Sequence, residues 1–310
     1  MRFRLAFALA FASALLASPG TLQARQPTDG SPDDFPDEIE VLSQREMARQ
    51  VFTDNLRQMV ERLSVFESVP RFFQPLCLDV AGLDTDQARY VADRILATSL
   101  DLGLGSPRSR CRVNAVVMVV DDPERMYKTL VSKRLDLVGV LPFRDVHTRR
   151  IENEVRAKRP VVWWSVIGQD SAQGPTFNDF GLAIFRDIAG SRTEMLIRRP
   201  KFLSVVMYDA NQLGGATLAQ IADHAALHLL GTPRRQIDFG GVRLPTMLTL
   251  FDDGPEASPE GLTDFDRAYL KGLYELGPGA FQSQVPRAVL AAYSEQCEAE
   301  QSDCRIRLRK

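Results

Sequence analysis

The sequence is poor in the residues from which most active sites are built. It contains three histidines and four cysteines in 310 residues. It has no GxSxG motif, no glycine-rich loop long enough to hold a phosphate, and no cysteine and histidine spaced as a nucleophile and its base. The basic residues are scattered except in the C-terminal stretch RIRLRK, and the formal net charge is −2. These absences argue against α/β-hydrolases, cysteine nucleophiles, phosphate-loop enzymes and nucleic-acid binding.

Long apolar runs are also absent, apart from one at the N-terminus. Arg2 and Arg4 precede an apolar run over residues 5–16, and helix-breaking residues follow. The run is too short to span a bilayer, so residues 1–24 are predicted to be a signal peptide cleaved after Ala24. A membrane anchor is the alternative. No membrane span is expected in the mature protein, and a periplasmic or secreted location follows.

Export determines how the four cysteines are interpreted. An even number of cysteines in an oxidising compartment favours disulfides over metal thiolates. Cys77 and Cys111 flank one predicted helix, and Cys297 and Cys304 lie close together in a polar segment. The spacing therefore predicts the pairs Cys77–Cys111 and Cys297–Cys304. A zinc site made of all four thiolates is the alternative, although the sequence has no CxxC pair.

The order of apolar patterns predicts an α+β fold with a mixed sheet. Residues 25–40 are rich in Pro, Asp and Gly and are predicted to be a disordered leader. A single globular domain is expected over 41–280, followed by a C-terminal tail over 281–310. Ser43 and Glu46 have the spacing of a capping box at the start of a helix that reaches Leu63. The other expected helices are 84–100, 123–133, 217–230 and 263–277, and the expected strands are 76–80, 113–120, 161–167, 181–185, 195–197 and 202–208.

Two adjacent tryptophans lie within one predicted strand. Because successive side chains of a strand point to opposite faces, Trp163 and Trp164 are expected on different sides of the sheet. An exposed ring would mark a surface for a ligand or partner. Packing of both rings into the core is the alternative interpretation.

The stretch HAALHLLG is the one motif with the residues of a metal site. His224 and His228 are four residues apart on a predicted helix, so both can point at one ion. Zinc hydrolysis also needs a third ligand and a carboxylate to take the proton from bound water. Asp238, Asp252 and Asp253 in the following loop are the candidates for the third ligand. The alternative is that both histidines are structural.

This stretch resembles the HExxHxxG signature of metzincin peptidases. Met247 lies downstream, where the methionine turn of such enzymes is expected, and the LTDFDRAYLKGLY segment that follows looks like their closing helix. The resemblance covers residues 200–277 and implies a zincin-like fold. The chain as a whole is similar to a family of secreted alphaproteobacterial proteins that implies no particular activity.

The chain departs from the metzincin pattern at two functional positions. Ala225 stands where the catalytic glutamate is expected, and Arg234 stands at the position of the third histidine. The sequence therefore predicts a non-catalytic protein without a cofactor, which binds an envelope partner or ligand. The alternative is a divergent zinc-dependent hydrolase that uses His224 and His228. A purely structural envelope protein is a third hypothesis.

Overall fold

The structure is a computed structural model that describes residues 37–60, 67–139, 146–171, 197–235, 237–239 and 243–299. The chain divides into two compact units, Met1–Gln44 and Arg45–Lys310. Only the first residues of one helix are described in the first unit, so the site belongs to the second. The predicted signal peptide, the predicted strand at 181–185 and most of that at 195–197 lie outside the described residues.

Nine α-helices are described. They are α1 (Asp37–Met59), α2 (Thr85–Asp101), α3 (Pro123–Lys133), α4 (Leu135–Val138), α5 (Val146–Arg156), α6 (Leu218–Leu230), α7 (Leu250–Asp253), α8 (Asp264–Glu275) and α9 (Val285–Ala299). The short 3-10 helices are η1 (Ala210–Gln212), η2 (Met247–Thr249) and η3 (Gln282–Gln284). No helix in the described part of the chain has both the length and the apolar character needed to cross a membrane.

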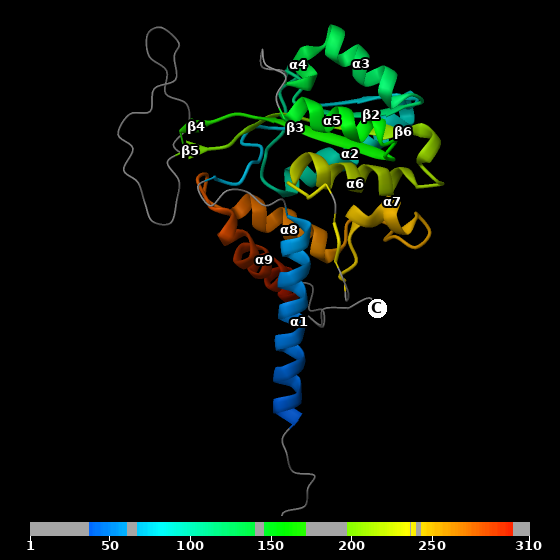
Figure 1. Ribbon diagram of the computed structural model, residues 1–310. Coiled ribbons are helices and arrows are strands. Elements are labelled where there is room, and N and C mark those ends of the chain that lie inside the picture. Colours follow the sequence, from blue (N-terminus) through cyan, green and yellow to red (C-terminus); the bar gives the residue numbers. More distant parts are fainter. Residues whose placement is uncertain are drawn as a thin grey trace, which may run out of the picture. The chain divides into compact units, whose positions relative to one another are not determined.

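The main sheet is mixed and has the strand order β1–β2–β6–β3. Its strands are β1 (Leu78–Ala81), β2 (Ala115–Val120), β3 (Val161–Ile167) and β6 (Lys201–Asp209). β1, β2 and β6 are parallel, whereas β3 runs antiparallel to β6 along the edge. A second, two-stranded sheet joins β4 (Asp170–Ser171) to β5 (Ile197–Arg198). The predicted α+β class with a mixed sheet is thus confirmed (Figure 1).

Alternation along the central strands divides the core into two layers. In β2, Val117 and Val119 face one cluster of buried residues, and Val116 and Met118 face the other. The first cluster includes α2, α6 and α8, and the second includes α3 and α5 (Figure 1). Because side chains of a strand alternate between faces, each central strand supplies apolar residues to both layers. The helix that carries the two histidines therefore packs on a fully covered sheet.

Apart from the four-residue helices α4 and α7, which were not predicted, three longer helices differ from the sequence expectations. α1 begins at Asp37, so part of the predicted leader is helical and the Ser43–Glu46 pattern lies inside a helix. α5 was not predicted, because most of its residues are polar or charged and only a few, such as Ile151 and Val155, are buried. α9 replaces much of the predicted tail and packs against α8. In these segments tertiary contacts, rather than local composition, determine the structure.

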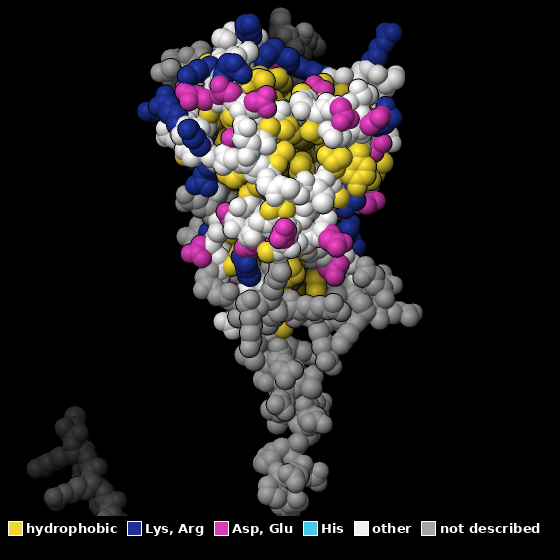
Figure 2. Space-filling view, turned by 90° about the vertical axis from the view of Figure 1, so that its right-hand side faces the viewer, with side chains coloured by type: hydrophobic (Ala, Val, Ile, Leu, Met, Phe, Trp, Pro, Cys, Tyr) yellow, Lys and Arg dark blue, Asp and Glu magenta, His cyan; other side chains and the backbone are white. Residues whose placement is uncertain are grey.

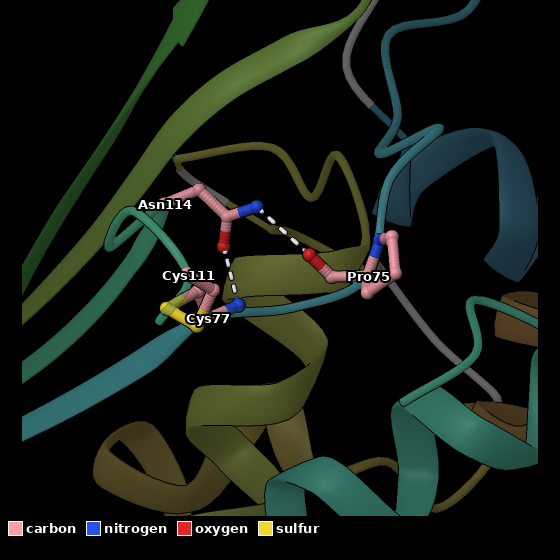
Figure 3. Close-up of a disulfide and its surroundings, with 4 residues drawn as sticks. All are labelled: Pro75, Cys77, Cys111 and Asn114. Atoms are coloured by element: carbon pink, nitrogen blue, oxygen red, sulfur yellow. Dashed lines mark hydrogen bonds between the residues drawn. A yellow bond between two sulfur atoms is a disulfide. The ribbon is translucent and has the colours of Figure 1, made fainter. Parts of the chain in front are cut away.

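The predicted disulfide between Cys77 and Cys111 is present, with a Cα–Cα distance of 5.9 Å (Figure 3). Asn114 holds the start of β1 beside it. Its Oδ1 accepts from the Cys77 amide at 2.7 Å, and its Nδ2 donates to the Pro75 carbonyl at 3.0 Å. The bridge therefore ties the segment before β2 to the start of β1. The second predicted pair, Cys297–Cys304, lies outside the described side chains.

Candidate functional site

Helix α6 carries the site and is defined by local sequence at its start. Thr217 and Gln220 form a capping box, in which each side chain binds the backbone amide of the other residue at 3.1 and 3.0 Å. The sequence predicted this cap correctly. It also predicted one apolar face, but every residue from Gln220 to Leu230 is buried. The helix is covered on all sides, so its polar residues need partners inside the protein.

The C-terminal end of α6 is closed by side chains from other elements. Lys201 Nζ donates to the Leu229 carbonyl at 2.7 Å and also to the Gly231 carbonyl. The hydroxyl of Tyr274 donates to the Leu230 carbonyl at 3.2 Å. These carbonyls have no partner within the helix, and a buried ammonium group also interacts favourably with the negative end of the helix dipole. This end of α6 is consequently fixed by β6 and α8.

Gly231 lies at the C-terminal cap of α6, where there is no space for a side chain. Its backbone has ordinary dihedral angles, with φ −83°. A Cβ at this position would lie 2.6 Å from the Leu227 carbonyl oxygen and 2.8 Å from the Tyr269 ring. The hydroxyl of Tyr269 accepts a hydrogen bond from the Thr232 amide at 2.8 Å. The glycine therefore allows α8 to approach the end of α6 closely.

A charged pair anchors the middle of α6 to its neighbours. Both Nε and Nη2 of Arg94 donate to the carboxylate of Asp223 at 2.7 Å. The Leu262 amide donates to the same carboxylate at 2.7 Å. The Asp223 side chain is only 2% exposed, while that of Arg94 is 36% exposed. A bidentate bond of this kind fixes orientation as well as distance, so α2 holds α6 at the residue before His224.

His224 and His228 face each other in the interior, 1% and 4% exposed. Their Nε2 atoms are 3.2 Å apart. On the other side of the His224 ring, Nδ1 lies 2.8 Å from the Tyr208 hydroxyl, which also donates to the Ile221 carbonyl at 3.3 Å. No histidine side chain is visible on the face drawn in Figure 2. The two histidines thus lie side by side as predicted, and the Tyr208 hydroxyl from β6 extends their hydrogen bonding.

Tyr208, His224 and His228 form a series of hydrogen bonds that leaves one ring nitrogen without a partner among the described residues. If the Tyr208 hydroxyl donates to Ile221, it accepts from Nδ1–H of His224, and Nε2 of His224 then accepts from Nε2–H of His228. If the hydrogen bonds run the other way, the Tyr208 hydroxyl donates to Nδ1 of His224, and Nε2–H of His224 donates to Nε2 of His228. In both cases a single proton lies between the two Nε2 atoms. His228 Nδ1 has no hydrogen-bond partner among the described residues.

Both histidines are neutral at physiological pH. Burial lowers the pKa of His224 to about 3. Burial also lowers the pKa of His228 well below its usual value, and the charges of His224, Arg235 and Lys201 lower it further. Removing an imidazolium ion from water is costly, and nearby cations add to that cost. The electrostatic potential at the pair therefore disfavours any additional positive charge.

A pocket of about 660 Å³ lies against the histidine pair, and we call it the histidine pocket. Its aromatic wall includes Trp163, whose ring centroid is 4.2 Å from that of His228, and Phe251, whose ring meets His224 edge-on at 5.2 Å. Trp164 lies on the other side of the sheet, where its indole N–H donates to the Leu137 carbonyl at 2.8 Å. The alternation of the two tryptophans is therefore as predicted. Four arginines line the pocket: Arg159, Arg234, Arg235 and Arg243.

The acidic candidates for a third ligand do not join the histidines. Asp238 and Asp252 line the pocket as exposed residues, and Asp253 binds Arg243 at 2.8 Å. Burial, followed by the charge of Asp253, raises the pKa of Asp252. Within the described part of the chain, no three or more His, Cys, Asp or Glu side chains are arranged to hold a metal ion. Because catalytic zinc sites use three protein ligands, the described residues do not supply the ligand set of a resident zinc ion.

At the position of the expected catalytic glutamate, the chain has an alanine that packs in the core. Ala225 is fully buried in the apolar cluster between α6 and its neighbours. The position of the expected third histidine is also used structurally. Arg234 donates to the Val60 carbonyl at 2.8 Å and to the Gln58 side chain at 3.1 Å. This arginine thereby holds the loop after α6 to the end of α1.

Met247 lies in η2, which packs against α6. The methionine is fully buried in the same apolar cluster as Ala225. Its backbone amide donates to Asp266 at 2.9 Å, and the Thr246 hydroxyl donates to the other carboxylate oxygen at 2.5 Å. Asp266 is also the third residue of the capping box that starts α8 at Thr263. One buried carboxylate thus fixes the methionine loop to α8.

Several residues of the site were not identified from the sequence. Tyr208 comes from β6, Arg159 from the turn before β3, and Arg235 from the loop after α6. Alternation in β6 could have placed Tyr208 on the same face as Val206. Nothing in the local pattern distinguishes Arg159 or Arg235 from other surface arginines, because only the packing of β3 beside α6 brings them to the pocket.

Comparison of the chain with protein-family models, curated proteins and solved structures gives no match.

Proposed function

We propose that the chain is a non-catalytic protein on a zincin-like scaffold, which binds an envelope partner or ligand through the histidine pocket. The observation that carries this proposal is the floor of the pocket. There, His224 and His228 are neutral, buried and hydrogen-bonded to each other, and neither lies in a group of metal-binding side chains. The volume of about 660 Å³ lies within the range of about 300–1,000 Å³ that is common for ligand pockets.

The scaffold part of the proposal is supported by the order and packing of four elements. β6 leads into the histidine helix α6, η2 with Met247 packs against α6, and α8 packs nearby. The metzincin resemblance requires the methionine loop beneath the histidine helix and a closing helix beside it. These contacts are of the kind that the resemblance requires.

The non-catalytic part is supported by two physical arguments. A general base typically contributes about 10²–10⁴-fold to a hydrolytic rate, and Ala225 removes the group expected to act as that base. Arg235 and Lys201 already disfavour a positive charge at His228, and a divalent cation would meet the same repulsion. A weakly bound zinc ion and a missing general base would both raise the activation barrier of hydrolysis.

A divergent zinc hydrolase is the second candidate, because one distance favours it. Two imidazole nitrogens bound to one tetrahedral zinc ion at about 2.0–2.1 Å are separated by about 3.3 Å. The Nε2 atoms of His224 and His228 are 3.2 Å apart. The same distance is that of an ordinary hydrogen bond, so direct measurement has to separate the two functions.

The test is incubation of the purified protein with excess zinc and a broad peptide library, with cleavage followed by mass spectrometry. We expect no cleavage and no stoichiometric zinc after dialysis. Chelator-sensitive cleavage that disappears in His228→Ala would reject the non-catalytic function and establish the hydrolase. Lys271→Ala serves as the control, because this residue forms only exposed ion pairs with Glu275 and Glu295.

Export to the envelope is also part of the proposal and rests on residues 1–24. Mass spectrometry of protein purified from cells should show an N-terminus near Arg25. An intact Met1 terminus would contradict export.

A further inference from the structure

A second hollow adjoins the histidine pocket and shares two of its arginines. This α5 hollow has a volume of about 670 Å³ and is lined by residues of α5 and of the turn that follows it. Arg159 and Arg235 line both cavities. Ligand pockets commonly have volumes of about 300–1,000 Å³, so the two together exceed the space that one small molecule fills.

The two hollows, which we together call the joined cavity because they share Arg159 and Arg235, carry a positive charge on a chain whose formal net charge is slightly negative. Six arginines and three carboxylates line the two hollows, whereas the formal net charge of the chain is −2. The arginines are Arg149, Arg150, Arg159, Arg234, Arg235 and Arg243. A concave surface with an excess of one charge concentrates ligands of the opposite charge, so the cavity favours an anion.

Two of these arginines are available to such a ligand. Arg235 is paired with Glu154, and Arg243 with Asp253. Arg149 and Arg159, in contrast, make no hydrogen bond or salt bridge to any described residue. Arg149 is exposed on α5 and Arg159 is half-buried where the hollows meet. Their guanidinium groups can each bind a carboxylate through two parallel hydrogen bonds.

The cavity also offers surfaces for apolar side chains. The histidine pocket presents Trp163, Phe239 and Phe251 beside its arginines, and the guanidinium of Arg235 lies 5.0 Å from the Trp163 ring centroid. At its floor, His228 has a buried nitrogen with no partner among the described residues. Cationic and aromatic side chains that line the same cavity match a peptide with acidic and apolar side chains better than a small uniform anion.

We propose that the joined cavity binds an extended acidic peptide segment of a partner protein, with carboxylates on Arg149 and Arg159 and an apolar side chain against Trp163. This inference rests on the proposed binding function and names its ligand class. Recognition of acidic motifs by arginine clusters is an established mode of peptide binding. The buried histidines supply the floor and carry no charge.

The experiment measures fluorescence anisotropy of a labelled octapeptide in which Glu and Phe alternate. The purified protein should bind this probe, and binding should weaken as salt is raised. A matched octapeptide with Gln in place of every Glu should bind at least about tenfold more weakly, because hydrogen bonds to charged groups contribute about 1.5–3 kcal/mol each.

The variant Arg149→Gln/Arg159→Gln should weaken binding of the acidic peptide at least about tenfold. It should fold normally, since neither side chain makes a hydrogen bond or salt bridge to a described residue. Arg108→Gln/Arg110→Gln makes the same change of charge at two exposed loop residues away from both hollows, and it should leave binding unchanged.

Three results would overturn the peptide assignment. These are equal binding of the Glu and Gln peptides, equal loss in both arginine variants, and tighter binding of tripolyphosphate than of the acidic peptide at the same arginines. Each of these results leaves the non-catalytic function unaffected. Binding followed by cleavage of the peptide would instead reject the non-catalytic function while supporting the peptide site.

Discussion

The Tyr208 hydroxyl lies 2.8 Å from Nδ1 of His224, and both groups are almost completely buried. This contact joins the last part of β6 to the histidine helix. It also fixes the orientation of the His224 ring, so that Nε2 faces His228 on the opposite side. The geometry of the pocket floor therefore depends on a residue outside the HAALHLLG motif.

Replacing Tyr208 with phenylalanine tests this dependence. We expect Tyr208→Phe to lower the free energy of unfolding by about 1–3 kcal/mol, because a buried imidazole nitrogen of His224 loses its hydrogen-bond partner. Urea denaturation measures the loss. Tyr90→Phe is the control, since Tyr90 is 46% exposed and its replacement should change stability by less than about 0.5 kcal/mol. Equal effects in the two variants would show that the hydroxyl contributes nothing.

Arg94→Ala should destabilise the protein by about 2 kcal/mol. The substitution leaves the Asp223 carboxylate, only 2% exposed, with the Leu262 amide as its remaining hydrogen-bond donor among the described residues. Loss of a partner from a fully buried ion pair costs about 3–5 kcal/mol, and the partial exposure of Arg94 reduces that figure because water can enter. Thermal and urea denaturation both measure the change.

The matched control lies one and a half turns earlier on α2. Arg89 forms a 3.4 Å pair with Asp86, with side chains 64% and 88% exposed. Arg89→Ala should therefore change the free energy of unfolding by less than about 1 kcal/mol. If it destabilises the protein as much as Arg94→Ala does, helix propensity rather than the buried pair explains both losses.

Removing the disulfide should cost about 2–4 kcal/mol of stability. Cys77 and Cys111 are 34 residues apart in sequence, and the bridge restricts the unfolded chain over that loop. Urea denaturation of Cys77→Ser/Cys111→Ser beside the oxidised wild-type protein measures the loss. A wild-type protein whose unfolding is insensitive to reductant would contradict this expectation.

The helix caps that sequence analysis predicted correctly depend on neighbouring residues. Thr217 with Gln220 and Thr263 with Asp266 each form a cap within one helical turn, so the pattern contains all the partners. The Ser43–Glu46 pattern failed because the preceding acidic residues, from Asp37 onward, continue the helix. A capping box marks a helix start only where the chain before it is not helical.

The site itself depends on contacts between distant segments. Tyr208 reaches His224 because β6 lies beneath α6, and Arg159 reaches the pocket because β3 pairs antiparallel with β6. The sequence motif identified the two histidines but none of these partners. The motif left both a metal site and a structural pair open, since spacing along a helix does not specify the residues that face it.

The histidine pair should make the protein sensitive to acid. Burial lowers the pKa of His224 to about 3 in the folded protein, against about 6.5 when unfolded. Below pH 6.5 the unfolded chain binds more protons, so the contribution of this residue is present above that pH and is lost as the pH falls toward 3. In His224→Gln/His228→Gln, the free energy of unfolding at pH 7 should be lower but should decline less between pH 6.5 and 4. An unchanged decline would show that other groups cause the sensitivity.

Asp266 should oppose this effect over part of the same range. Burial raises its pKa to about 6, above the usual 3.8, although three groups donate hydrogen bonds to it. The folded protein therefore binds more protons between pH 4 and 6, and the contribution of Asp266 is largest below pH 4 and is lost as the pH rises through 6. The difference amounts to about 3 kcal/mol, at about 1.4 kcal/mol for each tenfold change in proton affinity.

Asp266→Asn keeps a neutral side chain of the same shape at every pH, so its loss of stability on acidification from pH 6 to 4 should be steeper than that of the wild type. Urea denaturation at pH 7, 6, 5 and 4 measures both slopes, and a shallower decline in Asp266→Asn would show that Asp266 remains ionised throughout.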